Sequence, residues 1–125
     1  MKKIIQEKDL PHFVSTRDNR ERLDLITENT QCNKKYIRAD RIIYHQGDTC
    51  AKHFHKKSHH VFYILEGEGL IFNNESKQNL KPGMVIVVDP DEIHWFENKN
   101  DSKLKFIEFW IPPPSKTIWI DDDDI

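Results

Sequence analysis

Four of the seven histidines of this chain lie in one short segment, HFHKKSHH, at positions 53–60. Successive side chains of a β-strand alternate between its two faces, so His53 and His55 point to the same side of a strand. Neutral imidazole binds Zn, Cu, Fe and Ni, and two imidazoles on one strand form a chelate. The chemistry that this spacing predicts is metal binding.

Two further histidines complete the candidate site. His60 begins the apolar run that follows a short turn, with Phe62 at the same parity, so its side chain faces the same interior. His94 follows MVIVVDPDE and begins the segment HWFEN, so it reaches the site from a distant part of the chain. We therefore expect one divalent transition-metal ion (Fe, Mn, Zn, Ni or Cu) held by four imidazoles, those of His53, His55, His60 and His94.

The elements that must position these histidines are short β-strands. From residue 36 onward, runs such as VFYIL, LIF, MVIVV and LKFIEFWI alternate with segments rich in Gly, Pro, Asn and Asp, among them NNESKQN. The last of these runs ends at the prolines of positions 112–114, which cannot continue a hydrogen-bonded ladder. This pattern predicts an all-β protein, an antiparallel barrel or sandwich.

At 125 residues the chain has room for one domain. We expect an N-terminal arm or edge strands over residues 1–35, a barrel over 36–114, and a strap with an acidic tail over 115–125. The segment RDNRERLDL, 17–25, fits either one or two helical turns or an edge strand. The strap KTIWI fits either a last short strand or a surface that docks on a partner.

The histidines and the glycines around them resemble the two motifs of the cupin family. The first motif, G-x5-H-x-H-x(3,4)-E-x6-G, is matched in spacing by Gly47, His53, His55, His60 and Gly67. His60 stands where the family usually has Glu, and the adjacent His59 competes for that slot, but counting back from the second glycine favours His60. The resemblance implies a single small cupin β-barrel, a double-stranded β-helix of jelly-roll type, with a four-histidine metal site.

The second motif, G-x5-P-x-G-x2-H-x3-N, is matched in overall spacing by Gly83, His94 and Asn98. Asp89 and Asp91 replace the usual Pro and Gly, which predicts a different shape for the turn before His94. We interpret the motif glycines as turn residues with positive φ or close backbone contacts.

Strand parity also indicates which residues line the pocket. Phe62 and Phe96 each lie two positions beyond a candidate ligand and so turn inward beside the ion. Glu108 and Tyr63 are candidate polar groups of the pocket, although one parity class must face outward. The three remaining histidines are expected at the surface.

Composition restricts the classes of function. Lys and Arg number 19 against 21 Asp and Glu, a formal net charge of −2, so no basic surface for nucleic acid is indicated. The N-terminus lacks the apolar region of a signal peptide, and no run approaches the roughly 18 apolar residues of a membrane-spanning helix. We expect a cytoplasmic protein with no membrane partner, and with Cys32 and Cys50 as reduced thiols.

Four imidazoles leave the ion its full 2+ charge and leave one or two positions open for water, substrate or dioxygen. We therefore expect an enzyme that acts on a small chelating or anionic molecule, in the first place a dioxygenase-type oxidoreductase. A non-redox sugar-acid lyase or isomerase and a non-catalytic metal- and ligand-binding protein are the alternatives. The resemblance to small cupins also implies a homodimer, with the arm and the strap as expected contacts.

Overall fold

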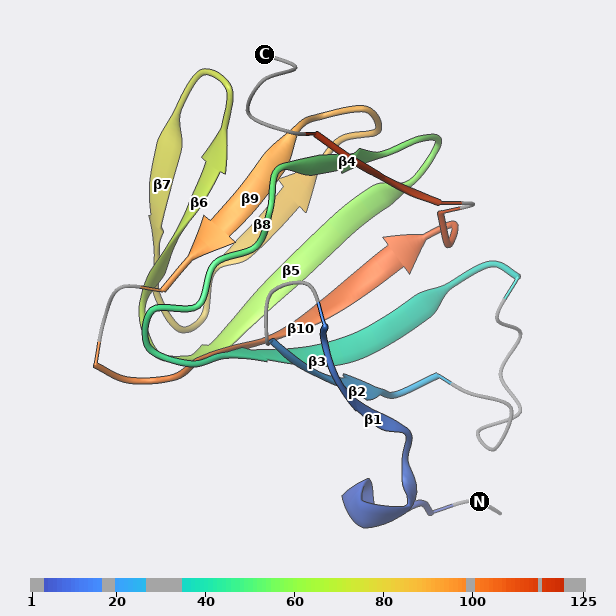
Figure 1. Cartoon of the computed structure of the whole chain (residues 1–125). Coiled ribbons are helices and arrows are strands. Elements are labelled where there is room, and N and C mark those ends of the chain that lie inside the picture. The colour runs from blue at the N-terminus through green and yellow to red at the C-terminus, as the bar shows by residue number, and fades with distance from the viewer. Residues whose placement is uncertain (1–3, 17–19, 27–34, 99–100, 115, 121–125) are drawn as a thin grey trace.

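Strands make up nearly all of the regular structure in the computed structural model of this protein (Figure 1). The structure describes residues 4–16, 20–26, 35–98, 101–114 and 116–120. A single 3-10 turn, Glu7–Asp9, precedes the first strand. Within the described ranges, no helix has the length and apolar character needed to span a membrane.

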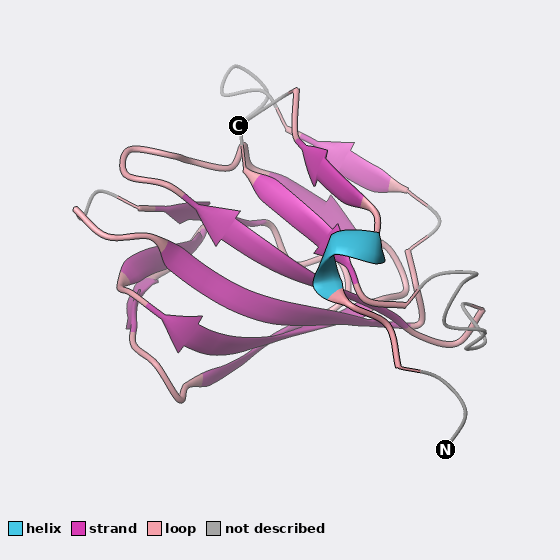
Figure 2. Cartoon of the chain, turned by 90° about the horizontal axis from the view of Figure 1, so that it is seen from below, coloured by secondary structure: helices cyan, strands magenta, loops and turns pink. Residues whose placement is uncertain are grey.

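The strands form two antiparallel sheets that face each other (Figures 1 and 2). The six-stranded sheet contains, in spatial order, β1 (His12–Val14), β2 (Glu21–Asp24), β3 (Arg38–Tyr44), β10 (Leu104–Ile111), β5 (His59–Glu66) and β8 (Val85–Val88). The five-stranded sheet contains β11 (Thr117–Trp119), β4 (His53–His55), β9 (His94–Glu97), β6 (Gly69–Asn73) and β7 (Lys77–Leu80). The all-β fold class expected from the sequence is confirmed.

Two segments that the sequence left open are strands. Within 17–25, residues 21–24 form β2, which pairs with β3, and β1 pairs in turn with β2, so the arm extends the six-stranded sheet of its own chain. The strap forms β11, which pairs with β4. Residues 17–19, Cys32 and the acidic tail lie outside the described residues, whereas Cys50 is buried.

One strand contradicts the sequence interpretation. We interpreted the segment NNESKQN as a turn. Its last three residues, together with Leu80, form β7, which pairs with β6. Three of the four side chains of β7 are exposed and only Leu80 is buried. Backbone hydrogen bonds to β6, and not side-chain packing, hold this edge strand in place. Its sequence therefore lacks the alternation of apolar and polar residues by which strands are recognised.

The core between the sheets is aromatic. Rings of Tyr44, Phe62, Phe96 and Phe106 lie with neighbouring centroids 4.9–6.0 Å apart. All four side chains are buried, and each is at most 3% exposed. Edge-to-face and offset contacts at these distances contribute about 0.5–1.5 kcal/mol per pair beyond the burial of area.

A glycine closes the turn between β5 and β6. Gly67 has φ +84°, and a Cβ atom there would lie 1.9 Å from the carbonyl oxygen of Lys103. Only glycine fits both the conformation and the space. The first cupin-like motif therefore ends on a glycine because the backbone before β10 passes directly over it.

Candidate metal centre

Three histidines meet where β4 adjoins β9. His53 and His94 are paired across the two strands, and His55 follows His53 on the same face of β4. All three side chains are buried. Each ring has one nitrogen that lies within 4.8 Å of a nitrogen of each of the other two rings. Donors this close together can bind one shared metal ion.

Two of these rings are fixed by backbone carbonyls. His53 Nδ1 lies 2.7 Å from the carbonyl oxygen of Ala51, and His94 Nδ1 lies 2.9 Å from that of Glu92. A carbonyl oxygen only accepts hydrogen bonds, so both Nδ1 atoms carry the proton and both Nε2 atoms keep a lone pair. Metal-binding histidines in proteins are commonly oriented by this kind of second hydrogen bond.

The third ring is fixed by a side chain. His55 Nδ1 lies 3.3 Å from the hydroxyl oxygen of Thr117 on β11. Nε2 of His55 and Nε2 of His94 are buried and have no hydrogen-bond partner within the described part of the chain. A buried nitrogen without a partner is unfavourable, and a metal ion would satisfy it. The three residues therefore fit a transition-metal ion.

Burial keeps these imidazoles neutral, which is the form that binds metal. It lowers the pKa of His55 to about 2 and the pKa of His53 well below its usual value, and positive charge on neighbouring histidines acts in the same direction. Burial also lowers the pKa of His94. The site thus offers neutral donors throughout the neutral pH range.

His60 joins the same cluster with a different orientation. Its ring centroid lies 5.4 Å from that of His55 and 5.7 Å from that of His94, and the ring stacks on Trp110. His60 Nε2 donates to Glu108 Oε2 at 2.6 Å, which leaves Nδ1 as the buried nitrogen without a partner in the described residues. The structure brings the predicted fourth ligand to the cluster, but it presents Nδ1 where His55 and His94 present Nε2.

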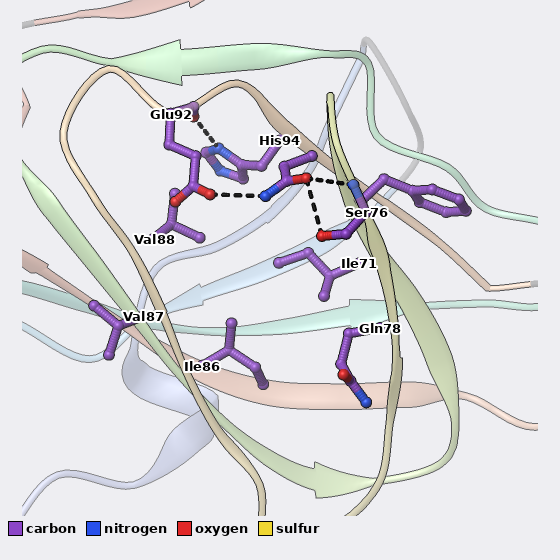
Figure 3. A pocket seen from close by; sticks show the side chains of 10 residues that line it. Ile71, Ser76, Gln78, Ile86, Val87, Val88, Glu92 and His94 are labelled. Atoms are coloured by element: carbon purple, nitrogen blue, oxygen red, sulfur yellow. Dashed lines mark hydrogen bonds between the residues drawn. The ribbon is translucent and has the colours of Figure 1, made fainter.

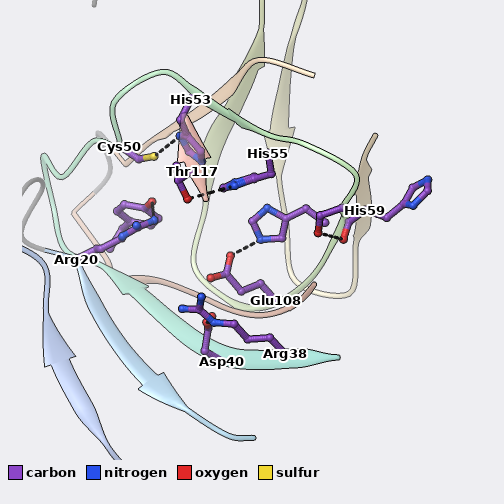
Figure 4. Close-up of polar contacts among 12 residues, drawn as sticks. Arg20, Arg38, Asp40, Cys50, His53, His55, His59, Glu108 and Thr117 are labelled. Carbon is purple, nitrogen blue, oxygen red and sulfur yellow. Dashed lines mark hydrogen bonds and ion pairs between the residues drawn. The ribbon is translucent and has the colours of Figure 1, made fainter. Parts of the chain in front are cut away.

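Two carboxyl groups, those of Glu108 and Asp40, lie beside one another (Figure 4). Asp40 on β3 stands opposite Glu108 on β10, and both side chains are buried. Burial, and then the charge of Glu108, raise the pKa of Asp40 to about 10. Asp40 is therefore protonated at neutral pH.

Two arginines flank the cluster, and the sequence interpretation missed both (Figure 4). Arg20, just before β2, places Nη1 3.5 Å from the buried Tyr44 hydroxyl, and its positive charge contributes to lowering the pKa of all four clustered histidines. Arg38 contributes in the same way to the pKa of His55 and His60, and its Nε lies 3.5 Å from Asp40. The cluster thus has positive charge on the side of the six-stranded sheet, whereas the charge of Glu92 acts on His94 from the other side.

The other predicted pocket residues lie on two different faces of their strands, as the alternation of side chains along a strand requires. Phe62 and Phe96 are buried in the aromatic core directly below the histidines, with Phe62 4.0 Å from the ring of His60. Tyr63 lies on the opposite face of β5 and is 43% exposed, so the structure does not bring it to the site. His59 also points outward, with 55% of its side chain exposed.

A cavity of about 160 Å³ reaches the centre from the gap between the sheets (Figure 3). Side chains of β6, β7 and β8 line it, including Ile71, Gln78 and Ile86, and His94 lies at its inner end. Asn73 donates to Glu92 Oε2 at 2.9 Å, which fixes the turn that leads into β9. A cavity of this size suits a molecule of only a few non-hydrogen atoms.

The turn before His94 has an aspartate where the motif usually has glycine. Asp91, in the slot usually taken by Gly, has φ 68°, and its backbone N–H donates to the carbonyl of His55 at 2.9 Å. Asp is one of the few residues other than glycine that adopts this conformation readily. The turn thus connects β9 to β4 on the ligand-bearing side.

The sequence matches a profile described as cupin domain over residues 40–111. An uncharacterised protein of Methanocaldococcus jannaschii is 31% identical over 92% of this chain and 91% of its own length. An oxalate-binding protein of Thermotoga maritima is 30% identical over 66% of this chain and 68% of its own length.

Among solved structures, a predicted oxalate decarboxylase from Thermotoga maritima superposes with a TM-score of 0.77 at 22% identity. The match covers 89% of this chain and 100% of that one. At this level of identity the likeness supports the fold, a double-stranded β-helix, and not a particular reaction.

Proposed function

Because the chain belongs to the cupin family, we propose that it binds one divalent transition-metal ion through His53, His55 and His94 and acts there on a small carboxylate-bearing anion. The observation that carries this proposal is the set of three buried imidazoles, each oriented through Nδ1, with Nε2 of His55 and Nε2 of His94 left without a partner in the described residues. When bound, such an ion supplies Lewis acidity toward a carboxylate or carbonyl oxygen. His60, through Nδ1, is the proposed fourth donor.

The charges around the centre favour an anionic substrate. The donor histidines are neutral, the positive charge of Arg20 acts on all four clustered histidines, and that of Arg38 acts on His55 and His60. Electrostatic attraction in a half-enclosed, low-dielectric site favours a ligand of opposite sign. The small cavity and the similarity to an oxalate-binding protein support a small mono- or dicarboxylate.

The polar groups near His60 favour a non-redox reaction of the lyase, decarboxylase or isomerase type. Glu108 accepts a hydrogen bond from His60 Nε2, and the protonated Asp40 lies beside Glu108. A chain of groups that can hold or pass a proton at the edge of a metal site is what such reactions require. The dioxygenase reaction expected from the sequence is the second candidate, because an all-histidine donor set also suits iron.

Metal analysis tests the donor set. Protein purified without added metal, His94→Ala and the control His59→Ala are compared by elemental analysis. We expect about one ion per chain in the wild type and in His59→Ala, whose side chain is 55% exposed, and much less in His94→Ala. Equal metal content in both variants would show that the three-histidine centre is assigned incorrectly.

The reaction class is tested with oxalate and related small carboxylates, using protein loaded with Zn, Mn or Fe. Product formed equally with and without air supports the non-redox reaction, and product formed only in air supports the dioxygenase. Tight binding without turnover would indicate the binding protein instead.

We further propose a homodimer that pairs through the outer face of β8, β5 and β10, because the arm and the strap are both paired within their own chain. This face carries apolar side chains without intervening charge, namely Val61, Tyr63, Val85, Val87, Ile107 and Phe109. Among them Val85 is 63% and Val87 is 55% exposed. Exposed apolar patches of a few hundred Å² commonly mark interfaces.

Sedimentation analysis tests the dimer. Val87→Glu should dissociate it, whereas Val14→Glu should not, because Val14 is equally exposed, at 59%, but lies on β1. A monomeric wild type at about 100 µM, far above the dissociation constant of a typical specific dimer, would contradict the proposal.

A further inference from the structure

The C-terminal strand β11 lies against the two histidines of β4. The two strands pair antiparallel, with Thr117 opposite His55 and Trp119 opposite His53. The backbone N–H of Ile120 donates to the carbonyl of Lys52 at 2.9 Å and continues the pairing past the end of β11. Directly opposite residues in an antiparallel pair have side chains on the same face. Thr117 and Trp119 therefore share the face that carries the histidines.

Each of these two side chains contacts one candidate ligand. The Thr117 hydroxyl oxygen lies 3.3 Å from Nδ1 of His55, and Figure 4 shows it beside that ring. The Trp119 ring packs on the ring of His53, with centroids 4.9 Å apart. His53 has a second support, the carbonyl of Ala51, whereas the contact with Thr117 is the one that the structure gives to Nδ1 of His55 within the described residues.

This difference bears on which nitrogen of His55 faces the other donors. With Nδ1 held at the hydroxyl of Thr117, Nε2 of His55 is the buried atom without a partner in the described residues. A hydroxyl both donates and accepts, so the contact holds the orientation of the ring in either tautomer, and a metal ion at Nε2 selects the tautomer with the proton on Nδ1. Without a partner at Nδ1, other ring orientations become accessible. Partners of this kind typically change metal affinity about 10- to 100-fold when they are removed.

We propose that β11 is a clamp for the metal centre, in which Thr117 is a positioning residue that fixes the orientation of His55, and Trp119 covers His53. The inference rests on the proposed metal function and adds to it a part of the chain, the C-terminal strap, that lies outside both cupin motifs. The strap is thereby assigned to the site of its own chain instead of a partner surface.

Cobalt binding tests the clamp in the full-length protein. Chelator-treated wild type, Thr117→Val, Thr117→Ser and Ile118→Val are titrated with Co²⁺ against a competing chelator, and the visible d–d bands are recorded. Thr117→Val keeps the shape of the side chain but loses the hydroxyl, so we expect a dissociation constant about 10- to 100-fold higher and shifted bands. Thr117→Ser should restore both. Ile118 lies opposite Phe54, on the other face, and Ile118→Val should match the wild type.

The failure of the clamp and the failure of the metal function give different results. A wild type that binds no Co²⁺ would overturn the proposed function and the clamp with it. A wild type that binds Co²⁺ while Thr117→Val binds equally well, with the same spectrum, would overturn the clamp alone.

A second measurement needs no variant to fold. The ¹H–¹⁵N correlations of the histidine rings in the Zn²⁺-loaded wild type report which nitrogen of each ring binds the metal and which carries the proton. The clamp requires that His55 binds through Nε2 and carries its proton on Nδ1, and a His55 that binds through Nδ1 would overturn it.

Discussion

The interior between the two sheets has two halves that are built from the same strands. The histidine half contains the clustered imidazoles and the groups behind them, namely His53, His55, His60, His94, Asp40, Glu108 and Trp110. The aromatic half contains Tyr44, Phe62, Phe96 and Phe106. A step of two residues along a strand leads from one half to the other, as from His60 to Phe62, from His94 to Phe96 and from Glu108 to Phe106.

Both halves are buried, but burial affects the stability of the fold differently in each. In the aromatic half, burial removes apolar surface from water and stabilises the fold. In the histidine half, buried nitrogens of three rings have no partner in the described residues, and burial lowers the pKa of the imidazoles. We infer that the aromatic half stabilises the fold. The histidine half lowers this stability in part, because it keeps nitrogen donors buried and available for a metal.

Acid should produce the largest difference between the halves. The imidazoles have pKa values lowered in the folded state, to about 2 for His55, so they are neutral in both states above pH 6.5 and cost nothing there. Below pH 6.5 the unfolded chain takes up protons that the folded chain does not, and stability is lost as the pH falls further. For chelator-treated protein we expect a loss on the order of 2 kcal/mol from His55 between pH 7 and pH 5, with further losses from the other three imidazoles.

Urea unfolding at several pH values measures this loss. His60→Leu should reduce the loss by about the share of one histidine, because a leucine does not titrate. Unfolding free energies that stay constant from pH 7 to pH 5 would contradict the assignment of the cost to the histidine half.

Truncation in the aromatic half should reduce stability at every pH. Phe106 is 1% exposed and contacts three other rings, so Phe106→Ala removes buried surface and leaves a cavity. We expect the unfolding free energy to fall by about 3–5 kcal/mol in urea denaturation. The control Phe13→Ala, at a ring that is 45% exposed, should change it much less. Equal effects would show that the aromatic half is not the stabilising part.

Asp40 should show the opposite pH dependence to the histidines. Its pKa is raised to about 10 in the folded state, so its contribution to stability is fully present below about pH 4 and is lost as the pH rises toward 10. Asp40→Asn imitates the protonated form and should raise the unfolding free energy at pH 8 by about 1–3 kcal/mol. Urea unfolding at pH 5 and pH 8 is the measurement, and a variant no more stable than the wild type at pH 8 would be the contrary result.

The smallest expected effect concerns Arg20, which joins the two halves by reaching Tyr44 beside the histidines. Arg20→Gln removes a positive charge near the centre and should weaken binding of oxalate about tenfold in calorimetry, with metal content unchanged. The control Arg41→Gln removes the same charge from a side chain that pairs with Glu7 at 2.9 Å. Equal weakening by both variants would indicate a general charge effect and no role for Arg20 at the site.

Local patterns in the sequence were sufficient for much of the fold and for the core of the site. Apolar runs between turn residues predicted β5, β6, β8 and β10, and strand parity placed Phe62 and Phe96 on the inner face. The same parity argument could have identified Asp40, which lies two positions before Ile42 on β3. It failed for β7, whose exposed polar side chains follow no burial pattern.

The sequence by itself determined that His53 and His55 share one face, because the two-residue repeat of a strand acts over short distances, and the cupin-like spacing predicted that His94 joins them. The tertiary structure alone decided the partners of those rings. His60 meets Glu108 across 48 positions, His55 meets Thr117 across 62, and Arg20 enters from an arm without any motif. These contacts depend on which strands become neighbours and in which register, and pairing over such separations leaves no periodic trace in the chain.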